Sequence, residues 1–149
     1  MIAHMNIVNA DETNLKEWVN LSVMLFPRHT FEEMFDRYKE FLTSKKELGF
    51  LYRKDNQFIG FMNISVRNDY VNGAITSPVA FIEAIYVLPN YRRQGIAKEF
   101  IKFAESFAKQ RGVTQLASDC LTENSSSENF HKRCGFIEKE RIICFIKDI

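Results

Sequence analysis

A nearly unbroken apolar run at residues 79–88 constrains the fold of this chain more than any other segment. Such a run is typical of a central strand that is buried on both faces of a sheet. Pro89 ends the run, and the apolar residues of segment 95–111 then recur at helical spacing up to Gly112, a residue typical of a helix end. A buried strand, a short turn and an amphipathic helix therefore follow one another directly.

The segments before this unit predict two helices, at residues 11–25 and 30–41, and a β-hairpin with strands 49–53 and 58–66. Asp11 is expected to cap the first helix, because its carboxylate can accept hydrogen bonds from free amides. Thr30 and Glu33 have the spacing of a capping box and mark the start of the second helix. The long polar connection 67–78 separates the hairpin from the buried strand, and loops of this length are often functional.

The segments after the unit predict a strand at 113–118, a short helix at 125–134 and two closing strands within 136–146. The predicted fold class is therefore α/β (α+β), with a mixed central sheet of about six to seven strands flanked by about four helices. A length of 149 residues, of which 46% are apolar, suits a single domain over residues 1–149.

The charge balance argues against several classes of partner. Twenty basic and 19 acidic side chains leave a formal charge of +1, so the chain has no global field that attracts nucleic acid or an anionic membrane. No apolar run approaches the roughly 18 residues of a membrane span, and residues 1–6 lack the features of a signal peptide. We expect a cytoplasmic protein with no nucleic-acid partner and no membrane partner.

The three cysteines, Cys120, Cys134 and Cys144, match neither a zinc site nor a disulfide scaffold. We expect reduced thiols and no metal. His131 stands three residues before Cys134 on an expected helix, so a reactive His–Cys pair is conceivable. A half-buried thiol is the interpretation that we favour.

The turn at residues 89–95, Pro-Asn-Tyr-Arg-Arg-Gln-Gly, has the features of a phosphate-binding site. A helix that starts here presents unpaired amides and the positive end of its dipole. Gly95 lets an anion approach the backbone, and Arg92 and Arg93 add positive charge. The alternative is an ordinary basic loop capped by a glycine.

Residues 92–97, Arg-Arg-Gln-Gly-Ile-Ala, resemble the acetyl-CoA signature of the GNAT acyltransferase superfamily, and Phe130-His-Lys-Arg-Cys-Gly-Phe136 is similar to a later motif of that superfamily. The resemblance implies the GNAT fold and acetyl-CoA as co-substrate. Backbone groups of one strand would pair with the pantetheine, beside a splay or bulge between neighbouring strands. The cofactor-binding residues that it implies are Ile85, Tyr86, Val87, Arg92, Arg93, Gln94, Gly95, Ile96, Ala97, Lys98, Asn124 and His131.

One departure from the superfamily pattern concerns proton transfer. Many members have a Tyr, proposed as the acid that protonates the departing thiolate, where this chain has His131. A His at this position either donates a proton, binds the sulfur by a hydrogen bond, or only packs the short helix. These alternatives remain open on the sequence.

Glu83 is the one charge in the apolar strand 79–88. A carboxylate there is costly unless it is paired or solvated, and such groups concentrate at functional sites. Asp119 follows the predicted strand 113–118 at its C-terminal edge, where open α/β sheets place ligands. The two acids are expected to share one cleft that receives a cation.

Several segments closely resemble the aminoglycoside 6'-N-acetyltransferases, in the subgroup of small dimeric enzymes, among them Arg67-Asn-Asp-Tyr-Val-Asn-Gly73 and Ala117-Ser-Asp119. The resemblance implies acetylation of the 6'-amine of an aminoglycoside by direct attack, with Glu83 or Asp119 as the base. The candidate substrate-binding residues are Trp18, Phe26, Tyr70, Glu83, Asp119 and Glu140. Trp18 and Phe26 are more often core residues, Tyr70 can simply pack the loop, and Glu140 can be a solvated charge.

The apolar segment 141–146 is a candidate edge strand, and the resemblance implies a homodimer in which C-terminal strands pair or exchange. Two rival functions fit part of the pattern. An acidic cleft also suits a polyamine or a protein amine, and a non-catalytic acyl-CoA sensor would keep the phosphate turn.

Overall fold

The computed structural model describes residues 4–149, so what was expected of residues 1–3 lies outside the described residues. The strands are β1 (Ile7–Asn9), β2 (Leu48–Lys54), β3 (Gln57–Arg67), β4 (Val79–Val87) and β5 (Leu116–Ala117). The helices are α1 (Leu15–Leu25), α2 (Phe31–Ser44), α3 (Ile96–Gln110) and α4 (Ser125–Arg133), with a short 3₁₀ turn at Pro89–Tyr91.

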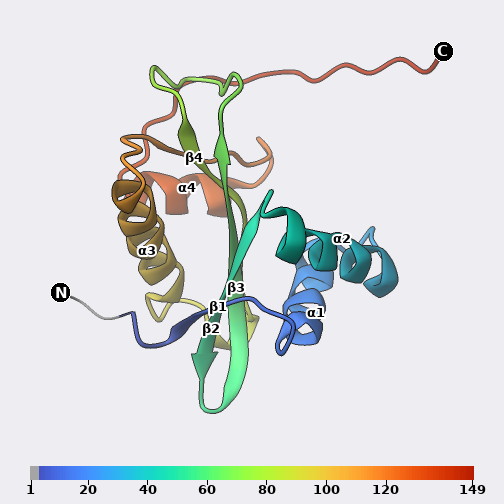
Figure 1. The fold of residues 1–149 in the computed structure, drawn as a ribbon. Coiled ribbons are helices and arrows are strands. Elements are labelled where there is room, and N and C mark those ends of the chain that lie inside the picture. The colour runs from blue at the N-terminus through green and yellow to red at the C-terminus, as the bar shows by residue number, and fades with distance from the viewer. Residues whose placement is uncertain (1–3) are drawn as a thin grey trace.

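The strands form one mixed sheet in the order β1-β2-β3-β4-β5. The pairs β1–β2, β2–β3 and β3–β4 are antiparallel, and β4–β5 is parallel. Helices α1 and α2 lie on one face of the sheet and α3 on the other (Figure 1). The structure thus confirms the predicted α/β fold class.

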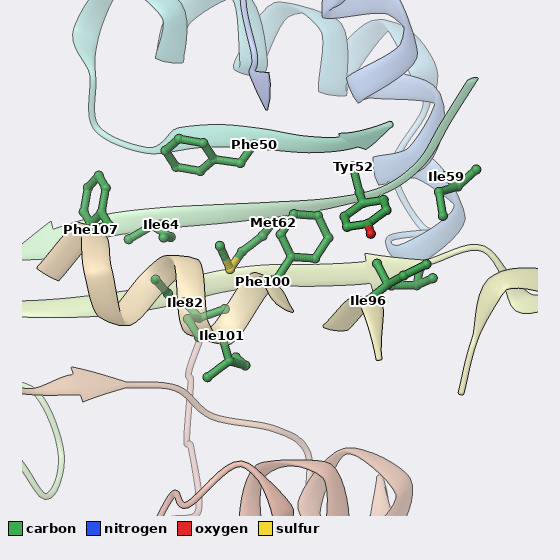
Figure 2. Packing of buried hydrophobic residues seen from close by; sticks show 12 residues of the cluster. Phe50, Tyr52, Ile59, Met62, Ile64, Ile82, Ile96, Phe100, Ile101 and Phe107 are labelled. Atoms are coloured by element: carbon green, nitrogen blue, oxygen red, sulfur yellow. The ribbon is translucent and has the colours of Figure 1, made fainter. Parts of the chain in front are cut away.

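The two faces of the sheet are covered by separate apolar clusters. Phe100 and Ile101 of α3 pack on Met62 and Ile82 of the sheet, all with exposed fractions below 5% (Figure 2). On the opposite face, the cluster under α1 and α2 includes the fully buried Trp18. Along β2, Phe50 and Tyr52 belong to the first cluster and Leu51 to the second, as the period of a strand requires.

Several local predictions are confirmed. Both halves of the capping box of Thr30 and Glu33 form at the start of α2. Asp55 and Asn56 have positive φ angles and form the turn between β2 and β3. Gly112, with a φ of 69°, follows the last residues of α3.

The predicted cap of the first helix is wrong. Helix α1 begins at Leu15 and its N-cap position belongs to Asn14. The carboxylate of Asp11 instead accepts a hydrogen bond of 2.8 Å from the amide of Thr13, in a turn that precedes the helix. An Asp binds an amide two residues on as readily as it caps a helix, so the residue type alone does not place the start.

The sheet has five strands over residues 4–149, fewer than the six to seven predicted, because segment 136–146 forms no strand. Residues 137–149, the C-terminal tail, are exposed. Glu138 and Arg141 still form ion pairs with α4, and the chain end beyond them extends away from the body of the molecule (Figure 1). Apolar side chains on the tail are largely in solvent, among them Phe145, which is 90% exposed. A strand needs a neighbouring strand for its amides and carbonyls, and the tail lies beside none that is described.

Strand β4 is paired irregularly along both of its edges. Its pairing with β5 covers only Ala80 and Phe81. On the other side, Asn63 of β3 pairs with Ala84 and Ile64 pairs with Ile82, so Glu83 is the extra residue of a β-bulge. A bulge re-aims a side chain and often lies next to an active site.

No helix within residues 4–149 is long and apolar enough to cross a membrane.

Candidate active site

The phosphate turn opens α3 as predicted. Gly95, with a φ of 80°, holds the N-cap position and has no side chain with which to cap the first amides of the helix. A Cβ built at Gly95 meets no atom within 4 Å, so the space beside this backbone is open. The amides of Ile96, Ala97 and Lys98 lie in the first turn that follows. These features suit an anionic phosphate group.

The two arginines of the turn differ in position. The side chain of Arg92 turns back to the strand, where its Nε donates a 2.8 Å hydrogen bond to the carbonyl of Val87 and its guanidinium lies 5.3 Å from the ring of Tyr86. Arg93 has a φ of 61° and an exposed side chain. Gln94 accepts a 2.8 Å hydrogen bond from Lys54 of the β2–β3 hairpin. Arg92 therefore holds the turn against β4, whereas Arg93 is the arginine free to meet a ligand.

The backbone beside the turn is open along one edge of β4. Pairing with β5 ends at Phe81, so the edge that includes Ile85, Tyr86 and Val87 faces no described strand, although the Val87 carbonyl is bound by Arg92. Unpaired amides and carbonyls on a strand edge can pair with an extended ligand. This is where the sequence predicted that the pantetheine arm binds.

Glu83, the bulged residue of β4, faces a cation. Its two carboxylate oxygens accept hydrogen bonds of 2.9 and 2.8 Å from Nε and Nη2 of Arg67, and Ser65 donates a third bond of 2.6 Å. The guanidinium of Arg67 also lies 3.5 Å from the centre of the Phe81 ring. The costly carboxylate predicted from the sequence is thus paired, by residues of the neighbouring strand β3.

Three carboxylates act electrostatically on this guanidinium, and Glu83 is the one in direct contact with it. The hydrogen bond to Glu83 raises the pKa of Arg67, and the negative charges of Glu83, Asp119 and Asp69 raise it further. Asp119 is exposed and follows β5 by two residues. The acids predicted to share a cleft therefore act on the same guanidinium, and Arg67 binds both oxygens of Glu83 in this state.

A small cavity of about 60 Å³ adjoins Glu83 on the face that α1 and α2 cover. Phe26 lines it, together with Glu47, Asn63 and residues of α2, and its contact with substrate remains a prediction. Trp18 does not reach it. Its indole is fully buried and donates a 2.9 Å hydrogen bond to the side chain of Asn63, so Trp18 has the position of a core residue.

Glu47 is a partly buried acid that the sequence analysis did not single out. Its carboxylate accepts a 3.1 Å hydrogen bond from Asn63, which also donates to the hydroxyl of Tyr38 at 3.2 Å. Burial raises the pKa of Glu47, and the negative charge of Glu83 raises it further, whereas the bond from Asn63 lowers it. This shift identifies a second carboxylate whose ionisation is opposed by its surroundings.

We expect Glu47→Gln to raise the melting temperature by about 2–4 °C at pH 7 and by less at pH 5. Because the pKa of Glu47 is raised above 4.5 in the folded protein, the native state binds this proton more tightly than the unfolded state does. Its ionised form therefore opposes folding at neutral pH, and that cost disappears as the pH falls through the folded pKa. Calorimetry at both pH values measures the difference. Glu40→Gln, on the exposed side of α2, is the control, and an equal gain at both pH values would contradict the prediction.

Asn124 and His131 lie at opposite ends of α4. The side chain of Asn124 caps the helix by accepting a 3.0 Å hydrogen bond from the amide of Ser127, which leaves its amide group for a ligand. His131 lies 2.7 Å from both Ser118 Oγ and the carbonyl oxygen of Ser127. Burial raises the pKa of the Cys134 thiol, and the imidazole bonds to serines instead. The structure thus favours the half-buried thiol over a His–Cys pair.

The other two predicted contacts lie on exposed segments. Tyr70 is 78% exposed on the loop between β3 and β4, and Glu140 is exposed on the tail. A Cβ built at Gly73 of that loop would clash with Lys139. The tail therefore passes against the loop next to Glu140, and both Tyr70 and Glu140 remain predictions.

Residues 15–136 match the family model described as "Acetyltransferase (GNAT) family". The chain belongs to the GNAT acetyltransferase family. Among GNAT relatives, an aminoglycoside N(6')-acetyltransferase type 1 of Acinetobacter baumannii is 40% identical over 149 residues, covering 97% of this chain and 99% of that protein. A protein of the same name from Salmonella enteritidis is 36% identical over 143 residues, covering 96% and 99%.

Solved GNAT structures are similar over nearly the whole chain. The aminoglycoside 6'-N-acetyltransferase AAC(6')-Ih from Acinetobacter baumannii has a TM-score of 0.89 at 39% identity, covering 97% of this chain and 98% of that one. AAC(6')-Iy in complex with the bisubstrate analog CoA-S-monomethyl-acetylneamine has a TM-score of 0.90 at 36% identity, covering 96% and 97%. The predicted GNAT fold is confirmed.

Acetyl-CoA is the co-substrate of this GNAT chain, and the geometry fits it. The open backbone at Gly95 and the uncapped first turn of α3 would hold the pyrophosphate, and the free edge of β4 the pantetheine. Across residues 4–149, no cluster of three or more His, Cys, Asp or Glu side chains has the arrangement of a metal site.

The sequence did not single out three residues of this GNAT site. They are Glu47, Ser118 and Arg67, the last as the partner of Glu83. For Arg67, the sequence does contain a pattern that indicates its place. Asn63, Ser65 and Arg67 alternate along an otherwise apolar strand, which places three polar side chains on one face. For Glu47, whose neighbours in the site lie far away in sequence, the chain offered no such pattern.

Proposed function

We propose that this GNAT enzyme transfers the acetyl group of acetyl-CoA to the 6'-amine of aminoglycosides. The amine attacks the thioester directly in a ternary complex. Acetylation removes the positive charge of that amine, so the enzyme would confer aminoglycoside resistance. We further propose that residues 1–149 act as one domain in the cytoplasm.

The observation that carries this proposal is the position of Glu83. It lies at the bulge of β4, on the strand whose edge beyond Phe81 suits the pantetheine, and it binds the guanidinium on which Asp119 and Asp69 also act. A polycation needs several carboxylates in one cleft even when the net charge of the protein is only +1. The names of the relatives that are about 40% identical over nearly the full chain support the same acceptor.

In the structure, the guanidinium of Arg67 occupies the cation-binding position at Glu83. Arg67 is about one-third exposed and binds both oxygens of Glu83. We propose that an ammonium group of the aminoglycoside takes over this pairing, while Asp119 and Phe26 also contact the substrate. Glu83 and Asp119 are then both candidates for the base that removes a proton from the ammonium group, directly or through water.

Thiol release from acetyl-CoA tests the acceptor. Kanamycin, spermidine and a peptide with a free amino terminus are supplied in turn, and release is expected only with kanamycin. Mass spectrometry of the product should show one acetyl group, and its NMR spectrum should place it on the 6'-nitrogen. Reaction with only spermidine or only the peptide would overturn the aminoglycoside assignment, and no reaction with any amine would favour the acyl-CoA sensor.

We also propose a homodimer that forms through the C-terminal tail. The tail carries exposed apolar residues, with Ile143 80% and Ile146 96% exposed, a poor arrangement for an isolated chain. An extended apolar segment and a two-residue strand β5 at the sheet edge complement one another as strands of two copies. Glu140 would then approach the cleft of the partner.

Removal of residues 137–149 is expected to convert the dimer into a monomer, because it deletes the segment that would pair with the second copy. Analytical ultracentrifugation should show the molecular mass fall by half. A shorter deletion of residues 147–149 is the matched control and should leave the dimer intact. A monomeric full-length chain, or a dimer that survives the longer deletion, would contradict this assembly.

A further inference from the structure

The imidazole of His131 is held at both nitrogens. Nδ1 lies 2.7 Å from the backbone carbonyl oxygen of Ser127, and Nε2 lies 2.7 Å from Oγ of Ser118. A carbonyl oxygen only accepts, so Nδ1 carries the proton. In the neutral ring Nε2 is then an acceptor, and the Ser118 hydroxyl donates to it. This is the arrangement of a hydroxyl, a base and a group that orients the base.

The pair lies where two strands part. Ser118 directly follows β5, whose pairing with β4 ends at Phe81 and Ala117. His131 comes from α4, and its ring is packed edge-on against Phe136, with centroids 5.2 Å apart. Ser118 therefore stands at the start of the gap whose other side is the free edge of β4. A thioester that pairs with that edge would occupy the place beside β4 that β5 leaves after Ala117, next to Ser118.

We propose that Ser118 and His131 form a proton relay in which Ser118 contacts the reacting atoms and His131 stores the proton. This inference rests on the proposed acetyl transfer and deepens it. It assigns Ser118 a catalytic role, and it gives His131 the role of a base before that of an acid. The carboxylates of the cleft are then left to bind the cationic substrate.

Ser118 and His131 together account for every proton transferred in the reaction. The neutral amine attacks the thioester carbon, so the C–N bond forms and the carbonyl oxygen becomes an oxyanion. A proton passes from the nitrogen to Ser118 Oγ as the serine proton moves to Nε2 of His131. When the C–S bond breaks, its electron pair leaves with the sulfur. The imidazolium then returns its proton to Ser118, whose hydroxyl proton passes to the thiolate.

The other candidate groups are less suited to this shuttle. Both oxygens of Glu83 are occupied by Arg67, and one also accepts from Ser65. The thiol of Cys134 has its pKa raised by burial, and no hydrogen bond of its sulfur is found among the described residues. His131 is the group near the gap that is already hydrogen-bonded to a hydroxyl and oriented by a carbonyl.

The test compares Ser118→Ala, His131→Gln and the double variant with the wild-type enzyme. Gln can keep a hydrogen bond to Ser118 but cannot accept and return a proton. Each single change should lower kcat by about 100-fold or more, with KM values and the Kd of coenzyme A within about twofold. The double variant should lose no more than the single ones, because the two groups act as one unit. His29→Gln, in the exposed turn that precedes α2, is the control and should keep wild-type kcat.

A purely structural pair is distinguished by chemical rescue. Imidazole added to His131→Ala should restore at least part of kcat, whereas lost packing between α4 and β5 would lower the melting temperature without rescue. Single variants that keep wild-type kcat, losses that multiply in the double variant, or an absence of rescue would overturn the relay. The assay uses whichever amine the wild-type enzyme acetylates. Turnover of only another amine therefore overturns the aminoglycoside proposal alone, and turnover of none overturns both.

Discussion

Gly95→Val is expected to bind coenzyme A about 100-fold more weakly than the wild-type protein. Gly95 has a φ of 80°, which a β-branched residue adopts only with strain. The new side chain would also occupy the open space beside the first turn of α3, where the phosphate must approach. One or two lost hydrogen bonds to a charged group, at about 1.5–3 kcal/mol each, correspond to a loss of this size. Isothermal titration calorimetry with coenzyme A measures it.

Gly112→Val is the matched control for this variant. Gly112 has a φ of 69°, and a Cβ there also meets no atom within 4 Å, but it lies at the other end of α3. Both variants therefore carry similar backbone strain, and only Gly95→Val obstructs the turn. Wild-type affinity in Gly95→Val would falsify the phosphate cradle. An equal loss in Gly112→Val would mean that strain in the helix, and not access to the backbone, is responsible.

Glu83→Gln is expected to lower kcat/KM for kanamycin by about 100-fold, while the Kd of coenzyme A changes less than twofold. The substitution removes the carboxylate that pairs with the cation of the cleft and leaves Arg67 uncompensated. A polycationic substrate then meets a positive charge where it needs a negative one. If Glu83 and not His131 were the base, its loss would enlarge the effect within the range of about 10² to 10⁴ that is typical of general-base catalysis. Steady-state kinetics and calorimetry measure the two quantities.

The double variant Arg67→Met/Glu83→Gln separates repulsion from the loss of Glu83 itself. If the free charge of Arg67 causes the defect, the double variant should recover much of kcat/KM. If Glu83 itself binds or deprotonates the substrate, the double variant should stay as slow as Glu83→Gln. Glu40→Gln, on the exposed side of α2, controls for the loss of one negative charge. Unchanged turnover in Glu83→Gln would remove this residue from the mechanism.

The parts of the fold that were predicted from the sequence depend on local interactions. The capping box at Thr30 and Glu33, the turn at Asp55 and Asn56 and the helix end at Gly112 each involve groups a few residues apart. Their geometry is therefore largely set by residue types and spacing. The prediction failed for segment 136–146, because β-formers specify a strand only when a partner strand is available.

The candidate site likewise combines features that were visible in the local sequence with contacts that were not. The phosphate turn at residues 89–95 and the charge at Glu83 within an apolar run were visible as patterns. The contacts of Glu83 and His131 were not, because Arg67 and Ser118 lie 16 and 13 residues away from them. Such pairs are brought together by strand register and by the docking of α4, which no local pattern encodes. Trp18 and Phe26 also looked equivalent in the sequence, yet one is core and the other lines a cavity.

The sequence by itself determined the order of most elements, the family and the place of the phosphate turn, since each follows from neighbouring residues. Only the tertiary structure decided how the charges of the cleft are paired. The bulge at Glu83 and the alternation of β3 aim Ser65 and Arg67 at one carboxylate. The end of the β4–β5 pairing places Ser118 within reach of His131. Both depend on the register between strands, which is set by packing over the whole sheet and not by any single segment.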